Sequence, residues 1–165
     1  FELFCPKSMA AQWWEGFLAE GVKPCGLGAR DSLRLEMCYP LNGNDLTPER
    51  TPLEAGLGFF VELEKDEFMG GEVLQKQKKE GLQERLVAIE VTERGAPPRA
   101  GYPVLSENGD PLGVLSSGGI SPCLGKGIGL AYLPVASAKI GTKLAIEIRG
   151  KKISAQVVKK PFYKK

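Results

Sequence analysis

Charged side chains crowd one short stretch of the chain that otherwise carries apolar residues. Arg30, Asp31, Arg34 and Glu36 lie close together in sequence, and both Arg30 and Asp31 are spaced to share a helix face with Arg34. One interpretation is an ion-pair cluster that fixes a helix to its neighbours. The other is that one arginine presents its planar fork to a ligand carboxylate, a bidentate contact that lysine cannot copy. The residue types alone leave both open.

The chain contains no histidine. This excludes the Ser-His-Asp and Cys-His nucleophile arrangements and the HExxH metal motif. Cys5, Cys25, Cys38 and Cys123 contain no CxxC pair, so we expect free thiols in a reducing cytoplasm and no metal site. Any chemistry must then come from carboxylates, from arginines and from the way the site orients its substrates.

Two glycine patterns, at residues 26–28 and 125–129, invite a phosphate-binding interpretation. A phosphate cradle needs glycines between a strand and the N-terminus of a helix. Residues 125–129 lie among predicted strands, and no full fingerprint follows Gly28. We therefore expect a turn or a close backbone approach at residues 125–129.

The composition is that of a globular protein with balanced charge. The 165 residues are 42% hydrophobic and 25% charged, with a net charge of +2, which argues against nucleic acid or an anionic membrane as partner. No apolar run is long enough to span a bilayer. Lysines crowd residues 151–165; we expect a solvated tail there, and the alternative is a landing site for an acidic partner.

The first part of the chain predicts mainly helices. Residues 1–5 alternate like a strand already under way, as if the chain began inside a fold. Pro6 and Ser8 can start a helix that Gly21 ends, with Trp13 and Trp14 expected in a core rather than against a ligand. A second helix over residues 26–37 would bury a face with four-residue spacing, made of Ala29, Leu33 and Met37.

The connecting region predicts a turn, two helix starts, a strand and a longer helix. Residues 42–45 have turn chemistry. Thr47-Pro48 and Thr51-Pro52 have the sequence of a helix N-cap followed by proline. We expect a strand over residues 59–63 and a helix over residues 66–79 that Gly81 ends.

From residue 86 onward the pattern predicts short strands separated by turns. The expected strands cover residues 86–91, 102–105, 112–115, 128–133, 144–148 and 153–158. Asn108-Gly109 and Arg149-Gly150 are typical hairpin connections. These strands favour a small antiparallel barrel or sandwich. We therefore predict an α+β protein, with an α/β part over residues 1–81 and an all-β domain over residues 82–165.

Several motifs, in order along the whole chain, resemble the glycine cleavage T-protein family. Residues 26–36 are similar to its GLGARDSLRLE signature, residues 40–45 to its LYG turn, and residues 51–58 to its TPxEAGLG stretch. Residues 94–104, 117–124, 128–132 and 160–163 continue the family's order. The resemblance implies the end of a ferredoxin-like α/β domain followed by the family's antiparallel barrel.

The resemblance also implies a reaction. In this family, H-protein carries an aminomethyl group on its lipoyl arm, tetrahydrofolate accepts the methylene carbon, and ammonia leaves. Tetrahydrofolate would thus be a co-substrate and H-protein a partner. Alternatives are a non-catalytic folate-binding or carrier-docking module, or the homologous tail of a dimethylglycine or sarcosine dehydrogenase.

Five residues inherit substrate-binding roles from the resemblance. Glu2 matches the glutamate that holds the pterin, whose two-donor edge suits a carboxylate. Arg30 matches the signature arginine that contacts folate. Phe59, where relatives often carry tryptophan, is expected against the folate's aromatic middle, and Arg99 and Tyr163 near the cleft.

Two departures from the family pattern bear on activity. Asn42 stands where the family usually has tyrosine. The family's N-terminal half, with the aspartate beside the reacting folate nitrogen, has no counterpart among these residues. No catalytic residue is therefore expected here, and a polypeptide of these 165 residues alone should be inactive.

Overall fold

The computed structural model describes residues 2–164 and divides the chain into two compact units, up to Asp31 and from Ser32 onward. The first unit contains the short helix η1 (Lys7–Met9), α1 (Ala10–Ala19) and the start of α2 (Leu27–Glu36). The strand predicted over residues 1–5 is wrong for the described residues, since 2–6 are irregular. A strand needs a hydrogen-bonded neighbour, and no strand of the described chain pairs with this segment; Phe1 lies outside the described residues.

Helix α1 forms as its spacing predicts, but its apolar face is not a core. Trp13 and Trp14 are both exposed, and Trp13 lies against Phe17 with ring centroids 6.1 Å apart. The expectation that the tryptophans are buried is therefore wrong in this structure. Amphipathic spacing specifies which face is apolar, whereas burial also needs an element that covers it.

Helix α2 also forms as predicted but buries a different face. Leu33, expected inside, is exposed, whereas Leu35 and Glu36 are buried. Cys38 follows the helix in the left-handed conformation, with φ 56°. The buried face of α2 is therefore the one that carries Leu35 and Glu36, not the one predicted from the four-residue apolar spacing.

The connection from α2 to the barrel has less regular structure than predicted. Residues 42–45 form the expected turn. Neither Thr-Pro pair starts a helix: Thr51 and Glu54 exchange backbone-to-side-chain hydrogen bonds, as in a capping box, but close only a turn. The predicted strand at residues 59–63 is also wrong, because the short helix η2 (Gly58–Phe60) lies there and no strand pairs with it. Helix α3 (Gly71–Glu80) starts later than expected and ends at Gly81.

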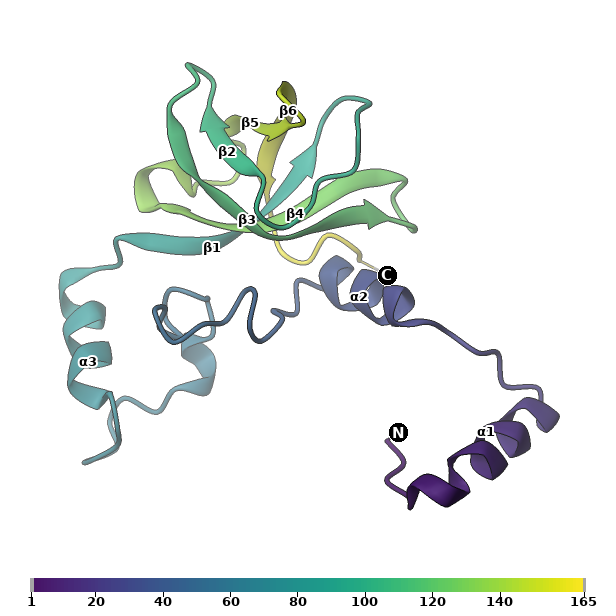
Figure 1. Cartoon of the computed structure of the whole chain (residues 1–165). Coiled ribbons are helices and arrows are strands. Elements are labelled where there is room, and N and C mark those ends of the chain that lie inside the picture. Colours follow the sequence, from purple (N-terminus) through teal and green to yellow (C-terminus); the bar gives the residue numbers. More distant parts are fainter. Residues whose placement is uncertain (1, 165) are drawn as a thin grey trace. The chain divides into compact units, whose positions relative to one another are not determined.

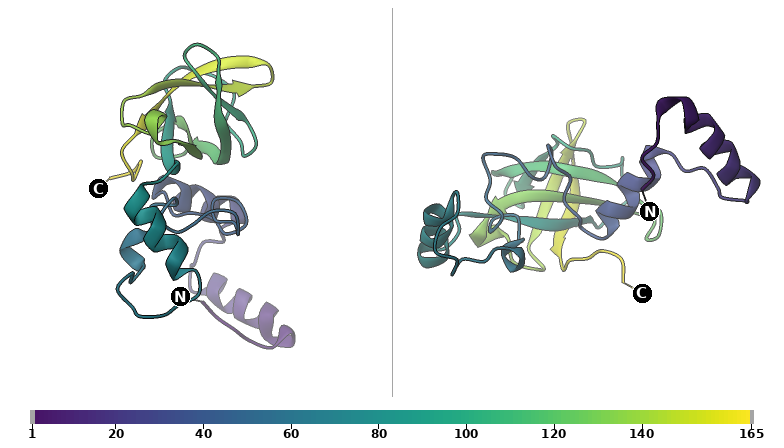
Figure 2. Two further views of the ribbon diagram at one scale, coloured as in Figure 1. Left: turned by 90° about the vertical axis from the view of Figure 1, so that its left-hand side faces the viewer. Right: turned by 90° about the horizontal axis from the view of Figure 1, so that it is seen from below.

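Six antiparallel strands close into a barrel, in the order β1-β4-β3-β2-β5-β6 (Figures 1 and 2). The strands are β1 (Glu84–Val91), β2 (Pro103–Ser106), β3 (Pro111–Ser121), β4 (Lys126–Pro134), β5 (Lys143–Ile148) and β6 (Lys151–Val158). All six predicted strands are confirmed, and closure removes the free sheet edges. The β5–β6 hairpin turns through Arg149 and Gly150, both at positive φ.

The barrel wall is covered on both sides along β1 and β4. Val87 and Ile89 belong to a cluster of buried residues that fills the barrel. The alternating residues Leu86 and Ala88 belong to a second cluster, which includes Leu35 of α2. Strand alternation thus gives β1 two buried faces, and the second face positions the C-terminal half of α2.

Two glycines of β4 allow neighbouring chain segments to approach closely. A Cβ on Gly129 would lie 2.9 Å from the carbonyl oxygen of Ser117, and a Cβ on Gly127 would lie 2.9 Å from Pro98. This confirms the expected close approach at residues 125–129.

Within residues 2–164, no helix is both long enough and apolar enough to cross a membrane.

Candidate functional site

The five predicted substrate-binding residues fall into two groups. Glu2, in the irregular segment before η1, and Arg30, in α2, are exposed and belong to the first unit. Phe59, Arg99 and Tyr163 belong to the second unit and are also exposed. Exposure leaves all five available to a ligand, and their roles stay predictions.

Within the second unit, Arg99 and Tyr163 lie near the C-terminal end of α2. The carbonyl oxygen of Glu36 accepts hydrogen bonds from the amides of Phe162 at 3.0 Å and Tyr163 at 3.1 Å. The backbone of Arg99 lies against Gly118 of β3, and the next residue, Gly119, faces Leu35 of α2. The ring of Phe59 lies edge-on to that of Phe60, with the ring centroids 5.5 Å apart.

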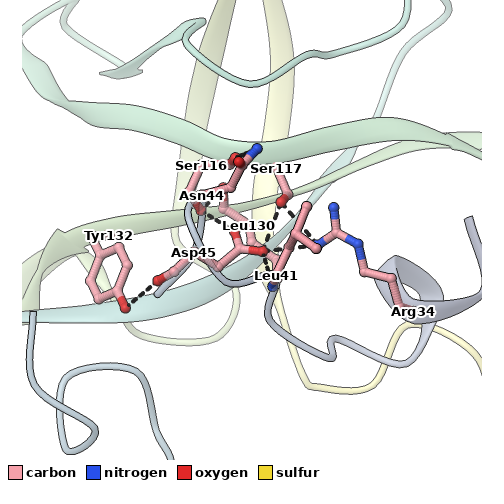
Figure 3. A network of polar contacts seen from close by, with 8 residues as sticks. All are labelled: Arg34, Leu41, Asn44, Asp45, Ser116, Ser117, Leu130 and Tyr132. Carbon is pink, nitrogen blue, oxygen red and sulfur yellow. Dashed lines mark hydrogen bonds and ion pairs between the residues drawn. The ribbon is translucent and has the colours of Figure 1, made fainter. Parts of the chain in front are cut away.

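The most densely bonded polar group near α2 is the carboxylate of Asp45, which is fully buried (Figure 3). It accepts hydrogen bonds from the Arg34 guanidinium at 2.9 Å and the Leu41 amide at 2.8 Å. The hydroxyls of Ser116 and Ser117 in β3 donate to it at 2.5 and 2.8 Å. One carboxylate thus joins α2, the residue 41–45 turn and the barrel.

The same turn is held from the barrel's β4. The Tyr132 hydroxyl donates to the backbone carbonyl of Asp45 at 2.8 Å. Arg50 lies over the Tyr132 ring, 4.2 Å from its centroid, and donates to Glu84 at 2.8 Å. Burial raises the pKa of Tyr132 to about 12, although the charge of Arg50 opposes the shift. Tyr132 therefore acts as a neutral hydrogen-bond donor.

A second buried carboxylate, Glu36, anchors the end of α2 to the β3–β4 connection. Ser121 donates to it at 2.5 Å and the Cys123 amide at 3.0 Å. Burial alone would raise the pKa of Glu36, but these hydrogen bonds outweigh it and hold the pKa below its ordinary value. The carboxylate is therefore ionised and engaged in structure at neutral pH.

These contacts separate the charged residues of the signature by role. Arg34 pairs with Asp45, which confirms the ion-pair interpretation for Arg34. Glu36 is held by hydrogen bonds from Ser121 and the Cys123 amide instead. The sequence motifs did not identify Asp45, Ser116 and Ser117, which form the network around Arg34. The available signal was a Ser-Ser pair inside an otherwise apolar strand together with an Asn-Asp turn, but nothing in the sequence places the two side by side.

Cys38 and Lys160 lie close together beneath the turn that carries Gly56. Burial raises the pKa of the Cys38 thiol to about 11 and lowers the pKa of the Lys160 ammonium. The thiol is protonated at neutral pH, so it cannot serve as a nucleophile. Across residues 2–164, no cluster of three or more acidic or cysteine side chains could hold a metal ion.

Comparison with known proteins matches almost the whole chain to one family. The model of the glycine cleavage T-protein C-terminal barrel domain matches residues 84–164, and that of the GCVT N-terminal domain matches residues 1–65. The first match coincides with the six-stranded barrel.

Similar proteins with curated names agree. The aminomethyltransferase of Desulfitobacterium hafniense (strain DSM 10664 / DCB-2) is 48% identical over 169 residues, covering 100% of this chain and 46% of the relative. That of Listeria monocytogenes serotype 4b (strain F2365) is 49% identical over 166 residues, covering 100% and 45%. The chain therefore spans less than half the length of these relatives.

A solved structure shares the fold. The crystal structure of glycine cleavage system aminomethyltransferase T from Bartonella henselae matches with a TM-score of 0.88 and 36% identity, over 96% of this chain and 45% of that one. The chain belongs to the glycine cleavage T-protein family.

Proposed function

We propose that these residues form the C-terminal portion of an aminomethyltransferase of glycine cleavage. The reaction moves the methylene carbon of an aminomethyl group from the lipoyl arm of H-protein to tetrahydrofolate and releases ammonia. The observation that carries this proposal is that the whole chain aligns with relatives named aminomethyltransferase at close to half identity. The direct test is methylene transfer by a chimera that supplies the rest of the enzyme.

Two side chains of the first unit would hold the folate. The carboxylate of Glu2 would accept from the amino group and the adjacent ring N–H of the pterin, a matched pair of donors. Arg30 would present its guanidinium to the folate. The assignment of Arg30 is supported by the contacts of its neighbours. Arg34 and Glu36 bond to buried partners, so Arg30 is the exposed arginine of the signature.

Three further residues would line the folate cleft. The Phe59 ring would stack on the aromatic middle of folate, which the exposure of that ring supports. Arg99 and Tyr163 would contribute from beside the end of α2. The backbone of Arg99 packs closely against Gly118, and the amide of Tyr163 donates to the carbonyl oxygen of Glu36.

The chain would consist of an α/β part over residues 1–81 and a barrel domain over residues 82–165. The end of α3 at Gly81, with φ 88°, and the start of β1 at Glu84 support a boundary there. The chemistry would rest on orientation of the two substrates rather than on a metal. The aspartate that assists the folate nitrogen would come from the family's N-terminal half.

The proposed folate contacts can be tested in a chimera. The part of the D. hafniense enzyme that precedes the matched region is joined to residue 1 of this chain, and tetrahydrofolate is titrated by calorimetry. We expect Arg30→Ala and Glu2→Gln each to weaken binding by about ten- to a hundredfold, as for a lost hydrogen bond to a charged group. Lys23→Ala, an exposed cation of the same unit, is the control and should bind like the parent. Equal binding by all four proteins would contradict the assignment.

A further inference from the structure

An apolar groove separates the loop that carries η2 from the start of α3. It has a volume of about 610 Å³. Its apolar lining includes Pro52, Phe60, Val61, Phe68, Met69 and Val73. Figures 1 and 2 show this loop folded against α3 at the start of β1. Lining of this kind, open to solvent, is typical of a surface that another structure covers.

The groove is bordered by a segment with the sequence of a strand and no sheet to join. Phe59 is 94% exposed and Phe60 79%, and Val61 has an extended backbone with φ −109° and ψ 114°. In the described chain the amides of Glu62 and Leu63 make no hydrogen bond. Glu62 and Leu63 therefore have the free backbone donors that strand addition to another sheet uses, next to the exposed side chains of residues 59 and 60. The amides of Phe60 and Val61 are already hydrogen-bonded within the η2 turn.

The charges around the groove are mainly acidic. Five carboxylates lie in the surrounding residues and are exposed: Glu62, Glu64, Asp66, Glu67 and Glu72. The neighbouring cations are Lys65, Lys76 and Arg50, and Arg50 is already paired with Glu84. A partner surface that matches this one is apolar at its centre, with lysine or arginine at its border.

The similar proteins contain a large part that could supply this surface. The chain is matched along its full length by relatives of which it covers only 45–46%. We propose that the extended residues 61–63 add as a short edge strand to a sheet of the family's preceding half, which also covers Phe59 and Phe60 and fills the groove beside α3. The proposal rests on the family assignment but not on the proposed reaction. Hydrogen exchange and thermal stability therefore test it independently of catalytic activity.

Hydrogen exchange compares the free chain with the chimera described above. Docking predicts that exchange of the Glu62 and Leu63 amides slows by about tenfold or more in the chimera, because a strand hydrogen-bonds both. The amide of Ile140, in an exposed loop of the barrel, should exchange alike in both proteins. Unchanged exchange at residues 62 and 63 would overturn the proposal.

A matched pair of substitutions tests the groove itself. Phe60→Asp should leave the melting temperature of the free chain unchanged and lower that of the chimera by about 2–4 °C or more. Ile140→Asp, at a side chain of similar exposure (68%), should change neither protein. Equal effects of Phe60→Asp on both proteins would contradict docking at this face.

A second copy of the chain is the competing occupant of the groove, and the free chain tests for it. Sedimentation of the chain should show a monomer, with or without Phe60→Asp. A dimer that Phe60→Asp dissociates would assign the groove to a second copy of the chain and overturn the proposal.

Discussion

The charged residues of the 30–36 stretch differ in what their side chains reach. Arg34 reaches the Ser117 hydroxyl of β3, whereas Glu36 accepts from the Ser121 hydroxyl and the Cys123 amide. Asp45 closes this arrangement, with an exposed fraction of 0% against 13% for its partner Arg34. A buried pair of this kind needs all its hydrogen bonds, since each ion has lost its hydration.

Asp45→Asn should be strongly destabilising. The amide would present N–H groups to donors that now meet a carboxylate, and Arg34 would lose its counter-charge. We expect a loss of about 3–5 kcal/mol in the free energy of unfolding, measured in urea. Asp110→Asn, at an exposed aspartate bonded to Ser106, is the matched control and should change stability by less than about 1 kcal/mol. A small effect at Asp45 would show that the network contributes little.

The buried carboxylate of Glu36 gives stability a defined pH dependence. Because its pKa is lower in the folded chain, its contribution is full above the unfolded value of about 4.3 and is lost as pH falls through the folded value. Glu36→Gln should therefore lower the free energy of unfolding by about 1.5–3 kcal/mol at pH 7.

That difference from the parent should narrow below about pH 4, where the parent's carboxylate becomes protonated. Unfolding in urea at a series of pH values measures it. Glu80→Gln, an exposed site on α3, should match the parent throughout. A difference between parent and Glu36→Gln that stays constant down to pH 3 would contradict the account of Glu36.

The elements differ in how far sequence alone predicts them. All six barrel strands were predicted because each is a short apolar stretch bounded by turn residues, and each finds pairing strands within the barrel. Residues 59–63 carry a similar pattern but form η2 and an extended segment, because a strand needs a hydrogen-bonded neighbour and no described strand pairs with them. The buried face of α2 was mispredicted because it is selected by polar contacts to Ser117 and Ser121, distant in sequence.

The residues of the candidate site also differ in how far the sequence alone predicts them. Arg30 and Glu2 could be proposed from family motifs, since those are local in sequence. Asp45 could not, because its role depends on β3 passing beside the residue 41–45 turn, and no local signal specifies that contact. Exposure of α1 could not be predicted either, since amphipathic spacing shows which face is apolar but not whether another element covers that face.

Close strand contacts give a prediction for β3. A Cβ on Gly113 would lie 2.5 Å from the carbonyl oxygen of Tyr132, whereas one on Gly119 would only touch Leu35 at 3.7 Å. Gly113→Ala should therefore destabilise the barrel by about 1–3 kcal/mol, the usual range for overpacking. Gly119→Ala, the same change in the same strand, should be tolerated in the same urea titration. Equal stability of the two variants would show that β3 and β4 can separate without strain.

At the scale of the whole molecule, the barrel and the end of α2 form a self-contained structure, whereas the proposed substrate contacts are exposed. The two family models match residues on both sides of the 66–83 connection, and the similar enzymes are more than twice as long as the matched region. We infer that this chain contributes half of a folate cleft. Its contribution to catalysis is then measurable only when the other half is present.

The most direct test of this account is formation of 5,10-methylenetetrahydrofolate from tetrahydrofolate and H-protein that carries the aminomethyl-lipoyl group. We predict turnover by the chimera with the D. hafniense N-terminal part, reduced by about tenfold or more in Arg30→Ala. The 165-residue chain alone should give none. A stably folded chimera without turnover, or turnover by the 165-residue chain alone, would contradict the account.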